Sequence, residues 1–105
     1  MKRLFLLIIF IITTYVYANG AVILLYHNVS DKTPKSTSVS INTFKKHLNY
    51  LYKNDFTVLP LETILNSLKN GKKLPKKSIA ITFDDAYKSI LTNAYPLLKE
   101  KKYPF

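Results

Sequence analysis

The fold of this chain is decided by the stretch Ser78-Ile79-Ala80-Ile81-Thr82-Phe83-Asp84-Asp85, an apolar run that ends on two adjacent carboxylates. Its alternating large apolar residues predict a buried β-strand. In α/β folds the chemistry gathers at the carboxyl ends of the strands, because the loops that leave the sheet there build a cleft. Two partly desolvated acids at such a place usually handle a cation or a proton. Asp84 and Asp85 are therefore candidate site residues, and the alternative is an ordinary aspartate-containing turn.

Two more segments have the composition of buried strands. Residues 21–26 form a continuous apolar run that ends in Tyr26-His27-Asn28, and residues 56–59 form a shorter run closed by Pro60. Between them, residues 30–40 are polar and predict a loop. We therefore expect three strands, of which the acid-tipped one is the last.

Helical periodicity follows each predicted strand. The first helix has the apolar stripe Phe44, His47, Leu48 and Leu51, with Asn42 or Thr43 as its cap. His47 is expected to pack on that stripe. The second helix is Leu61–Lys69, stopped by Asn70-Gly71, and the third covers about residues 87–101, bent by Pro96. The stripe of the third helix is Ile90, Leu91, Ala94, Leu97 and Leu98.

The order strand, helix, strand, helix, strand, helix predicts an α/β fold with a parallel sheet. Three such βα units are too few to close a barrel or to cover both faces of a sheet. Residues 19–105 contain no cysteine, so no disulfide compensates for the small core of a secreted chain of this size. Folding in isolation is therefore in doubt.

The amino terminus has the layout of a secretory signal peptide. A short basic segment, Met1-Lys2-Arg3, precedes the almost unbroken apolar residues 4–12, and Val16-Tyr17-Ala18 resembles a cleavage site. We expect residues 1–18 to be a signal peptide, with cleavage after Ala18 and export to the periplasm, the cell envelope or the medium. The alternative is an uncleaved anchor that tethers the chain to a membrane. Residues 4–18 are fewer than the roughly 20 that a spanning helix needs, which favours cleavage.

The net charge of +10 comes almost entirely from lysine, since the chain contains 16 basic residues and a single arginine. Nucleic-acid readers favour arginine for bidentate contacts, so we expect no nucleic-acid partner. Many lysines occur as adjacent pairs on segments expected to be solvated. Weak attraction to anionic wall polymers or lipid headgroups is the alternative interpretation.

Three ordered motifs resemble the polysaccharide deacetylase family, also called the NodB-homology or carbohydrate esterase 4 family. Thr82-Phe83-Asp84-Asp85 resembles its first signature. Upstream, Leu24-Leu25-Tyr26-His27-Asn28-Val29 resembles a Tyr-His strand, and residues 93–99 resemble the helix after the acid pair. Together the matches cover residues 21–105, and they resemble the N-terminal portion of the family's domain.

The resemblance implies a metal-dependent N-deacetylase on a distorted (β/α) barrel, of which this chain would be the first three βα units, truncated. Asp84 would be the general base and Asp85 a ligand of a divalent metal, usually zinc. His27 would contact the substrate or support a residue that does, the alternative being an ordinary loop hydrogen bond. The substrate would be a polysaccharide that contains N-acetylglucosamine.

The chain also departs from the family pattern. Relatives complete the metal site with an H-x-x-x-H helix, whereas His27 and His47 are the only histidines here and lie on different elements. One carboxylate does not hold a catalytic zinc, which needs about three protein ligands. The family usually has Gly where this chain has Ala86, and we expect the methyl group to be tolerated if φ stays negative.

Two functions follow. The first is an exported polysaccharide deacetylase, of which residues 19–105 are the front portion of the domain, inactive alone. The second is a non-catalytic remnant that binds carbohydrate or a membrane.

Overall fold

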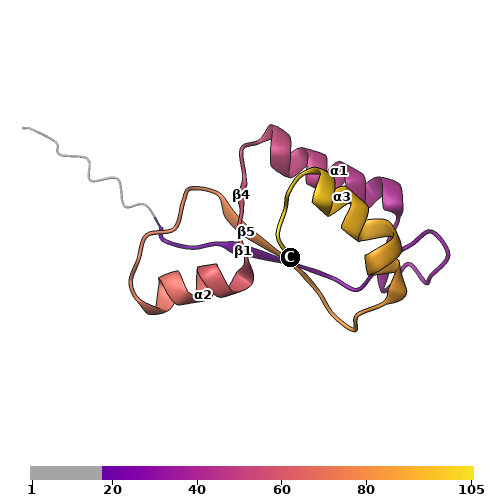
Figure 1. Cartoon of the computed structure of the whole chain (residues 1–105), viewed down its shortest axis with the longest axis horizontal. Coiled ribbons are helices and arrows are strands. Elements are labelled where there is room, and N and C mark those ends of the chain that lie inside the picture. The colour runs from indigo at the N-terminus through magenta and orange to yellow at the C-terminus, as the bar shows by residue number, and fades with distance from the viewer. Residues whose placement is uncertain (1–17) are drawn as a thin grey trace, which may run out of the picture.

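The computed structural model describes residues 18–105 (Figure 1). The predicted signal peptide therefore lies, apart from Ala18, outside the described residues and stays a prediction. The elements, in chain order, are β1 (Val22–Tyr26), β2 (Asn28–Val29), β3 (Ser38–Val39), α1 (Ile41–Lys53), β4 (Thr57–Val58), α2 (Leu61–Lys69), β5 (Ser78–Phe83), the π-helix η1 (Ile90–Ala94) and α3 (Tyr95–Glu100). The predicted α/β fold with a parallel sheet is confirmed. The pair β2–β3, also parallel, was not predicted.

The acid-tipped strand β5 lies in the middle of the main sheet, whose strand order is β1-β5-β4. It pairs in parallel with β1, where Val22 is opposite Ile79 and Tyr26 is opposite Phe83. On its other side it pairs in parallel with β4. Among the strands of the main sheet, β1 and β4 follow each other along the chain, yet they are not neighbours, because β5 lies between them.

This strand order places helices on both faces of the sheet. The connection from β1 to β4 crosses β5 in one direction, and the connection from β4 to β5 returns. If both crossovers have the usual right hand, α1 and α2 must lie on opposite faces. Figure 1 shows α1 and α3 together on one side of the strands and α2 on the other. On the α2 face Ile23 and Leu25 of β1 stay more than half exposed, so coverage of that face is incomplete.

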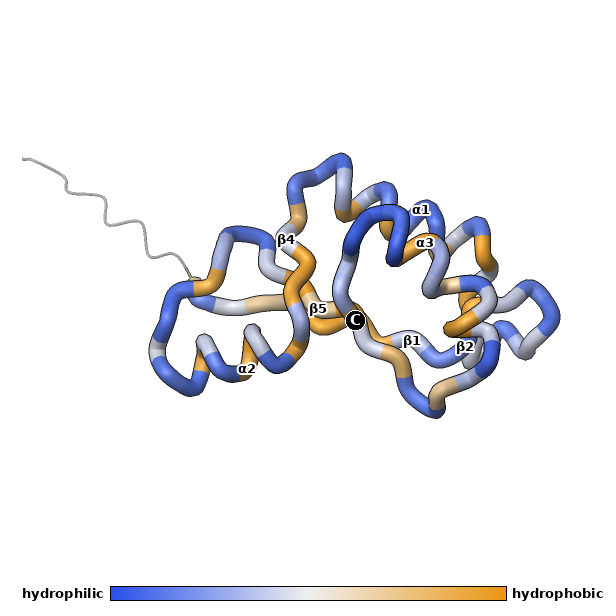
Figure 2. Tube along the Cα trace, in the orientation of Figure 1, coloured by the Kyte–Doolittle hydropathy of each residue, from blue (hydrophilic) through white to orange (hydrophobic). Residues whose placement is uncertain are grey.

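The main core lies between the sheet and the α1–α3 layer. Alternate residues of β5, Ile79 and Ile81, point into it, as side chains of a strand alternate between faces. Figure 2 shows β5 as an apolar strand beneath two helices with one apolar side each. The buried members of this cluster are Val29, Phe44, Leu48, Leu51, Ile79, Ile81, Ala94 and Leu98.

Helix α1 begins earlier than predicted, and its cap is Ser40 rather than Asn42 or Thr43. The Ser40 hydroxyl accepts a hydrogen bond from the Thr43 N–H at 3.0 Å, which satisfies one of the unpaired amides at the helix start. The expected packing of His47 is corrected too, because its side chain is exposed at the margin of the buried stripe. Its Nδ1 lies 2.8 Å from the Tyr26 hydroxyl.

The last predicted helix is split by a wide turn. Pro96 has no N–H to donate to the turn before it, and the Tyr95 N–H bonds to the Ile90 carbonyl five residues back. The extra residue in this π turn changes which side chains share a face. Ala94 and Leu98 are buried as predicted, whereas Leu91, expected on the stripe, is 68% exposed.

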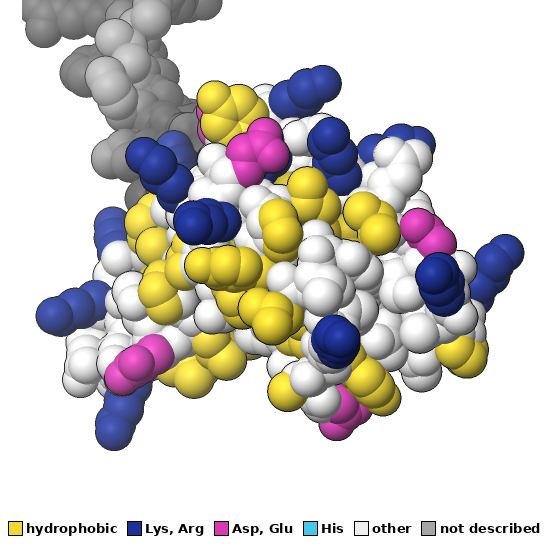
Figure 3. Space-filling model, turned by 45° about the vertical axis from the view of Figure 1, so that its right-hand side comes forward, with side chains coloured by type: hydrophobic (Ala, Val, Ile, Leu, Met, Phe, Trp, Pro, Cys, Tyr) yellow, Lys and Arg dark blue, Asp and Glu magenta, His cyan; other side chains and the backbone are white. Residues whose placement is uncertain are grey.

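Many large apolar side chains remain on the surface. Figure 3 shows hydrophobic side chains gathered across the middle of one face, with lysines around them. In the main sheet, Val22, Ile23 and Leu25 of β1 are each more than half exposed. Among the described residues, no helix has the length and apolar character needed to cross a membrane.

Candidate active site

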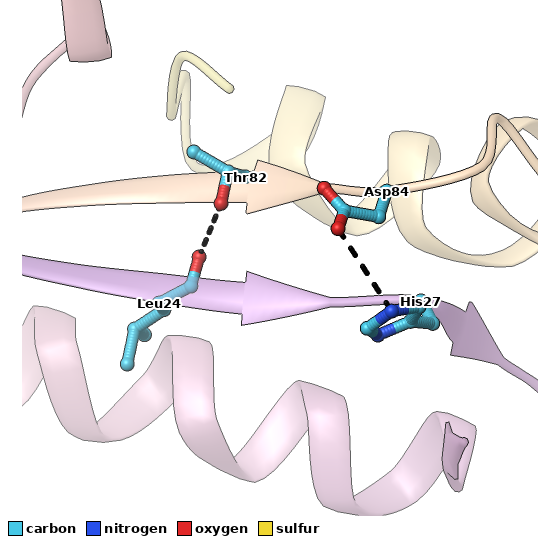
Figure 4. Close-up of polar contacts among 4 residues, drawn as sticks. All are labelled: Leu24, His27, Thr82 and Asp84. Carbon is cyan, nitrogen blue, oxygen red and sulfur yellow. Dashed lines mark hydrogen bonds and ion pairs between the residues drawn. The ribbon is translucent and has the colours of Figure 1, made fainter.

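The candidate site lies where β1 and β5 end side by side. The Asp84 N–H donates to the Tyr26 carbonyl at 2.9 Å, so the pairing of the two strands continues one residue past β5. Earlier in the strands, the Thr82 hydroxyl donates to the Leu24 carbonyl at 2.9 Å (Figure 4). These two bonds fix the register at which the residues beyond the strands face each other.

Asp84 and His27 are brought together by that register. Nε2 of His27 lies 3.9 Å from Oδ2 of Asp84, and Figure 4 shows the two side chains pointing toward each other from adjacent strand ends. Their side chains are 37% and 56% exposed, respectively. A protonated His27 would form an ion pair with the carboxylate, and a neutral one leaves Asp84 free to accept a proton from another group.

Asp85 is placed by an unusual turn. Its φ is +68°, and that of Ala86 is +43°, so two successive residues occupy the left-handed region. The condition on which we expected the Ala86 methyl group to be tolerated, a negative φ, is therefore not met. Only glycine enters this region without steric cost, whereas Asp is one of the side chains that tolerate it. The turn takes the chain sharply out of the sheet and leaves both carboxylates exposed.

A partly buried polar cluster supports the His27 side of the site. The Ser89 hydroxyl donates to Oδ1 of Asn28 at 3.0 Å and accepts from the Val29 N–H at 3.2 Å. The Asn93 side-chain amide donates to the Val29 carbonyl at 2.7 Å. The segment that follows the acid pair thereby holds the residues that follow His27. The sequence analysis missed Ser89 and Asn93, although polar residues on a mostly apolar helix were a usable signal.

Two open hollows adjoin the site. One, of about 210 Å³, is lined by His27, Asn28 and part of the 35–39 segment. The other, of about 560 Å³, is lined by Glu62, Phe83 and Ala86 among others. Glu62 lies in the first turn of α2, just after the end of β4, and so adds a third exposed carboxylate to this edge of the sheet. An extended ligand that crosses the edge would contact both hollows.

Tyr26 turns away from the site toward α1. Its ring lies edge-on to Phe44, with centroids 5.1 Å apart, and burial raises the pKa of its hydroxyl above the ordinary value of 10.0. Tyr26 thus anchors the end of β1 to the core, while the next residue, His27, faces Asp84.

Within residues 18–105 no three His, Cys, Asp or Glu side chains lie close enough to hold a metal ion. A catalytic zinc needs about three protein ligands, so the described residues alone do not fit one. Asp85 could supply a single carboxylate. We therefore derive no step of the chemistry through a metal.

Residues 71–105 match the family model described as polysaccharide deacetylase. Relatives extend the similarity over most of the chain. A poly-β-1,6-N-acetyl-D-glucosamine N-deacetylase of Staphylococcus aureus strain MSSA476 is 37% identical over 82% of this chain, and one of Escherichia coli K12 is 31% identical over 82%. The chain belongs to the polysaccharide deacetylase family. It spans about a third (34%) of the S. aureus relative's length and 13% of the E. coli relative's.

The fold of the chain agrees with its place in this family. The structure of IcaB from Ammonifex degensii superimposes with a TM-score of 0.74 at 30% identity, and the match covers 88% of this chain and 39% of that one. The resemblance to the polysaccharide deacetylase family and the predicted partial, NodB-like fold are both confirmed. The roles of Asp84, Asp85 and His27 stay predictions, since what the structure adds is the proximity of His27 to Asp84.

Proposed function

We propose that this chain is part of an exported enzyme that hydrolyses N-acetyl groups of a polysaccharide containing N-acetylglucosamine. The observation that carries the proposal is the His27–Asp84 pair at the carboxyl edge of the central strand, in a chain similar to N-deacetylases. Two named relatives act on poly-β-1,6-N-acetyl-D-glucosamine, which makes this polymer the first substrate to test.

In this proposal Asp84 is the general base. Its side chain is open to solvent on one side and to His27 on the other, so it can take a proton from an attacking water. His27 would hold the carboxylate in place and contact the substrate. The hollows on either side would seat neighbouring sugar units, and Glu62 would offer hydrogen-bond acceptors to sugar hydroxyls.

Asp85 would contribute one ligand to a divalent metal, zinc in the first instance. The remaining ligands would have to come from residues outside the described set, because no group of three lies within it. When bound, such a metal would polarise the acetamide carbonyl and acidify water. The chain by itself is accordingly proposed to be inactive.

The test is a chimera in which residues 19–105 replace the matching part of the S. aureus relative. Release of acetate from poly-β-1,6-N-acetyl-D-glucosamine is measured for the chimera and for its Asp84→Asn and Asp31→Asn variants. Asp31 is an exposed loop acid and the matched control. Loss of general-base catalysis should lower kcat about 100-fold or more in the first variant alone. An Asp84→Asn chimera as active as its parent would refute the proposal.

A non-catalytic, carbohydrate-binding role is the second candidate, and the lack of three clustered ligands among residues 18–105 favours it. The two candidates differ in what the chimera does. Binding of soluble N-acetylglucosamine oligomers by residues 19–105, combined with an inactive chimera, would favour the second candidate.

A further inference from the structure

The hollow beside His27 has a positively charged wall. Residues 30–37 connect β2 to β3, and Lys35 and Ser36 of this loop line the hollow of about 210 Å³, which we call the lysine hollow. The Lys35 side chain is exposed, and within residues 18–105 its ammonium group has no hydrogen-bond or ion-pair partner. The charge of Lys35 is therefore available to a ligand that enters the hollow.

Backbone hydrogen bonds hold the Lys35 loop against the site. The Asn28 N–H donates to the Thr37 carbonyl at 3.1 Å, and the Thr37 N–H donates to the Pro34 carbonyl at 3.1 Å. Lys35 lies inside the turn that the second bond closes. Its place beside the hollow is therefore fixed by the residue that directly follows His27.

The hollow on the other side of the site carries the opposite charge. Phe83 and Ala86, which flank the acid pair, line the hollow of about 560 Å³ together with Glu62, and we call it the glutamate hollow. In the described part of the chain the Glu62 carboxylate also has no hydrogen-bond or ion-pair partner. The lysine hollow adjoins β1, whereas the glutamate hollow adjoins β5 and the residues that follow β4. Because β5 lies between β1 and β4, the two charges flank the site from opposite sides.

The proposed reaction changes the charge of the sugar on which it acts. Water adds to the acetamide carbonyl carbon, the bond from that carbon to nitrogen breaks, and acetate leaves. The remaining amine, with a pKa of about 8 like that of an α-amino group, takes up a proton at neutral pH. Each turnover therefore converts a neutral N-acetylglucosamine unit into a cationic glucosamine unit, and charge distinguishes the two.

We propose that the two hollows distinguish neighbouring sugar units by charge, the lysine hollow taking an N-acetylated unit and the glutamate hollow a glucosamine unit. This inference rests on the proposed function for its ligand. Lys35 repels the ammonium group of glucosamine, and Glu62 attracts it. A polymer that advances by one unit after each turnover, from the lysine hollow toward the glutamate hollow, meets both preferences every time. Deacetylation then proceeds along the polymer in one direction.

The test measures binding rather than turnover. The protein is the chimera with the S. aureus relative, carrying Asp84→Asn to prevent turnover, and calorimetry gives the dissociation constants. The ligands are β-1,6-linked trimers of N-acetylglucosamine in which the unit at one end, and then at the other, is replaced by glucosamine or by glucose. Glucose lacks the acetyl group but carries no charge. The affinity ratio of the glucosamine and glucose trimers therefore isolates the effect of charge at each end.

We expect glucosamine to bind up to about fivefold more weakly than glucose at one end and up to about fivefold more tightly at the other, the range of exposed charge pairs. Lys35→Gln should abolish the first effect and Glu62→Gln the second, and Lys35→Glu should reverse the first. Lys32→Gln is the matched control, because it removes an exposed lysine of the same loop from outside the lining of the hollow. It should keep both effects, and salt should weaken both.

Three results would overturn the proposal: no binding of any trimer, equal affinity for glucosamine and glucose at both ends, or equal changes in Lys35→Gln and Lys32→Gln. Acetate release by the chimera with Asp84 intact tests the proposed function separately. An active chimera that ignores the charge of the end units would refute this inference alone. An inactive chimera that distinguishes them in the expected way would refute the proposed reaction alone.

Discussion

Nε2 of His27 lies 3.9 Å from Oδ2 of Asp84, across the ends of two strands that are far apart in the sequence. This distance is longer than a hydrogen bond, and both side chains are more than a third exposed. The pair therefore adds little to stability, because exposed ion pairs contribute about 1 kcal/mol or less. The contribution of the pair is instead to place the Asp84 carboxylate beside His27.

Replacing His27 should affect catalysis less than replacing Asp84. In the chimera with the S. aureus relative we expect His27→Ala to lower kcat/KM about fivefold, equivalent to the roughly 1 kcal/mol of such a pair. Asp84→Asn should cost about 100-fold or more. If His27 acts through Asp84, the double variant should be no worse than Asp84→Asn alone. Fully additive losses would show that His27 acts independently.

Replacing Ala86 by glycine should stabilise the protein. Ala86 has a φ of +43°, and a non-glycine residue in the left-handed region costs about 1–2 kcal/mol. Ala86→Gly is therefore expected to raise the free energy of unfolding by about 1 kcal/mol in urea titrations of the chimera. Gly71→Ala is the mirror-image control, since its φ is +65° and the added methyl meets no atom within 4 Å. A gain from Gly71→Ala would contradict the conformational explanation.

The cluster below His27 should be sensitive to the loss of Asn93. Asn93→Ala leaves the buried Val29 carbonyl without its side-chain donor, which should cost about 1–3 kcal/mol of unfolding free energy. Asn42→Ala removes the same group from an exposed position on α1 and should change stability by about 0.5 kcal/mol at most. Thermal unfolding of both variants in the chimera decides the matter, and indistinguishable midpoints would contradict the proposed support.

The chain alone should not bind zinc tightly. No three His, Cys, Asp or Glu side chains of residues 18–105 are clustered, and a single carboxylate is a weak ligand. Isothermal titration calorimetry of the 105-residue chain with zinc should show no sub-micromolar site. A sub-micromolar site that Asp85→Asn abolishes would mean that the described residues rearrange to complete it.

Stability should fall at high pH through Tyr26. Burial raises the pKa of its hydroxyl in the folded state, so above the unfolded value of 10.0 the unfolded chain loses its proton first. The stabilisation is complete below pH 10 and is lost as the pH rises through the folded-state pKa. Urea titrations of the chimera at pH 8 to 11 should show a steeper fall for the parent than for Tyr26→Phe. Parallel pH profiles would contradict this.

Most elements of the fold could be predicted because their residues carry local signals. Helix α2 begins and ends as predicted at Leu61–Lys69, since an apolar stripe and a glycine stop both act within a few residues. The third helix was predicted less well. Pro96 predicted a bend but not the π turn before it. That turn depends on the hydrogen bond from the Tyr95 N–H to the Ile90 carbonyl, and the exposure of Leu91 follows from the turn.

The sequence by itself determined the acid-tipped strand, the parallel α/β class and the family, because alternation, periodicity and short motifs are properties of neighbouring residues. Only the tertiary structure decided that β5 lies between β1 and β4, and that His27 therefore meets Asp84. Strand order, the support from Ser89 and Asn93, and the position of Lys72 beside Asn19 all depend on contacts between residues far apart in the chain. Such contacts are selected by the packing and the handedness of the whole sheet, which no local pattern encodes.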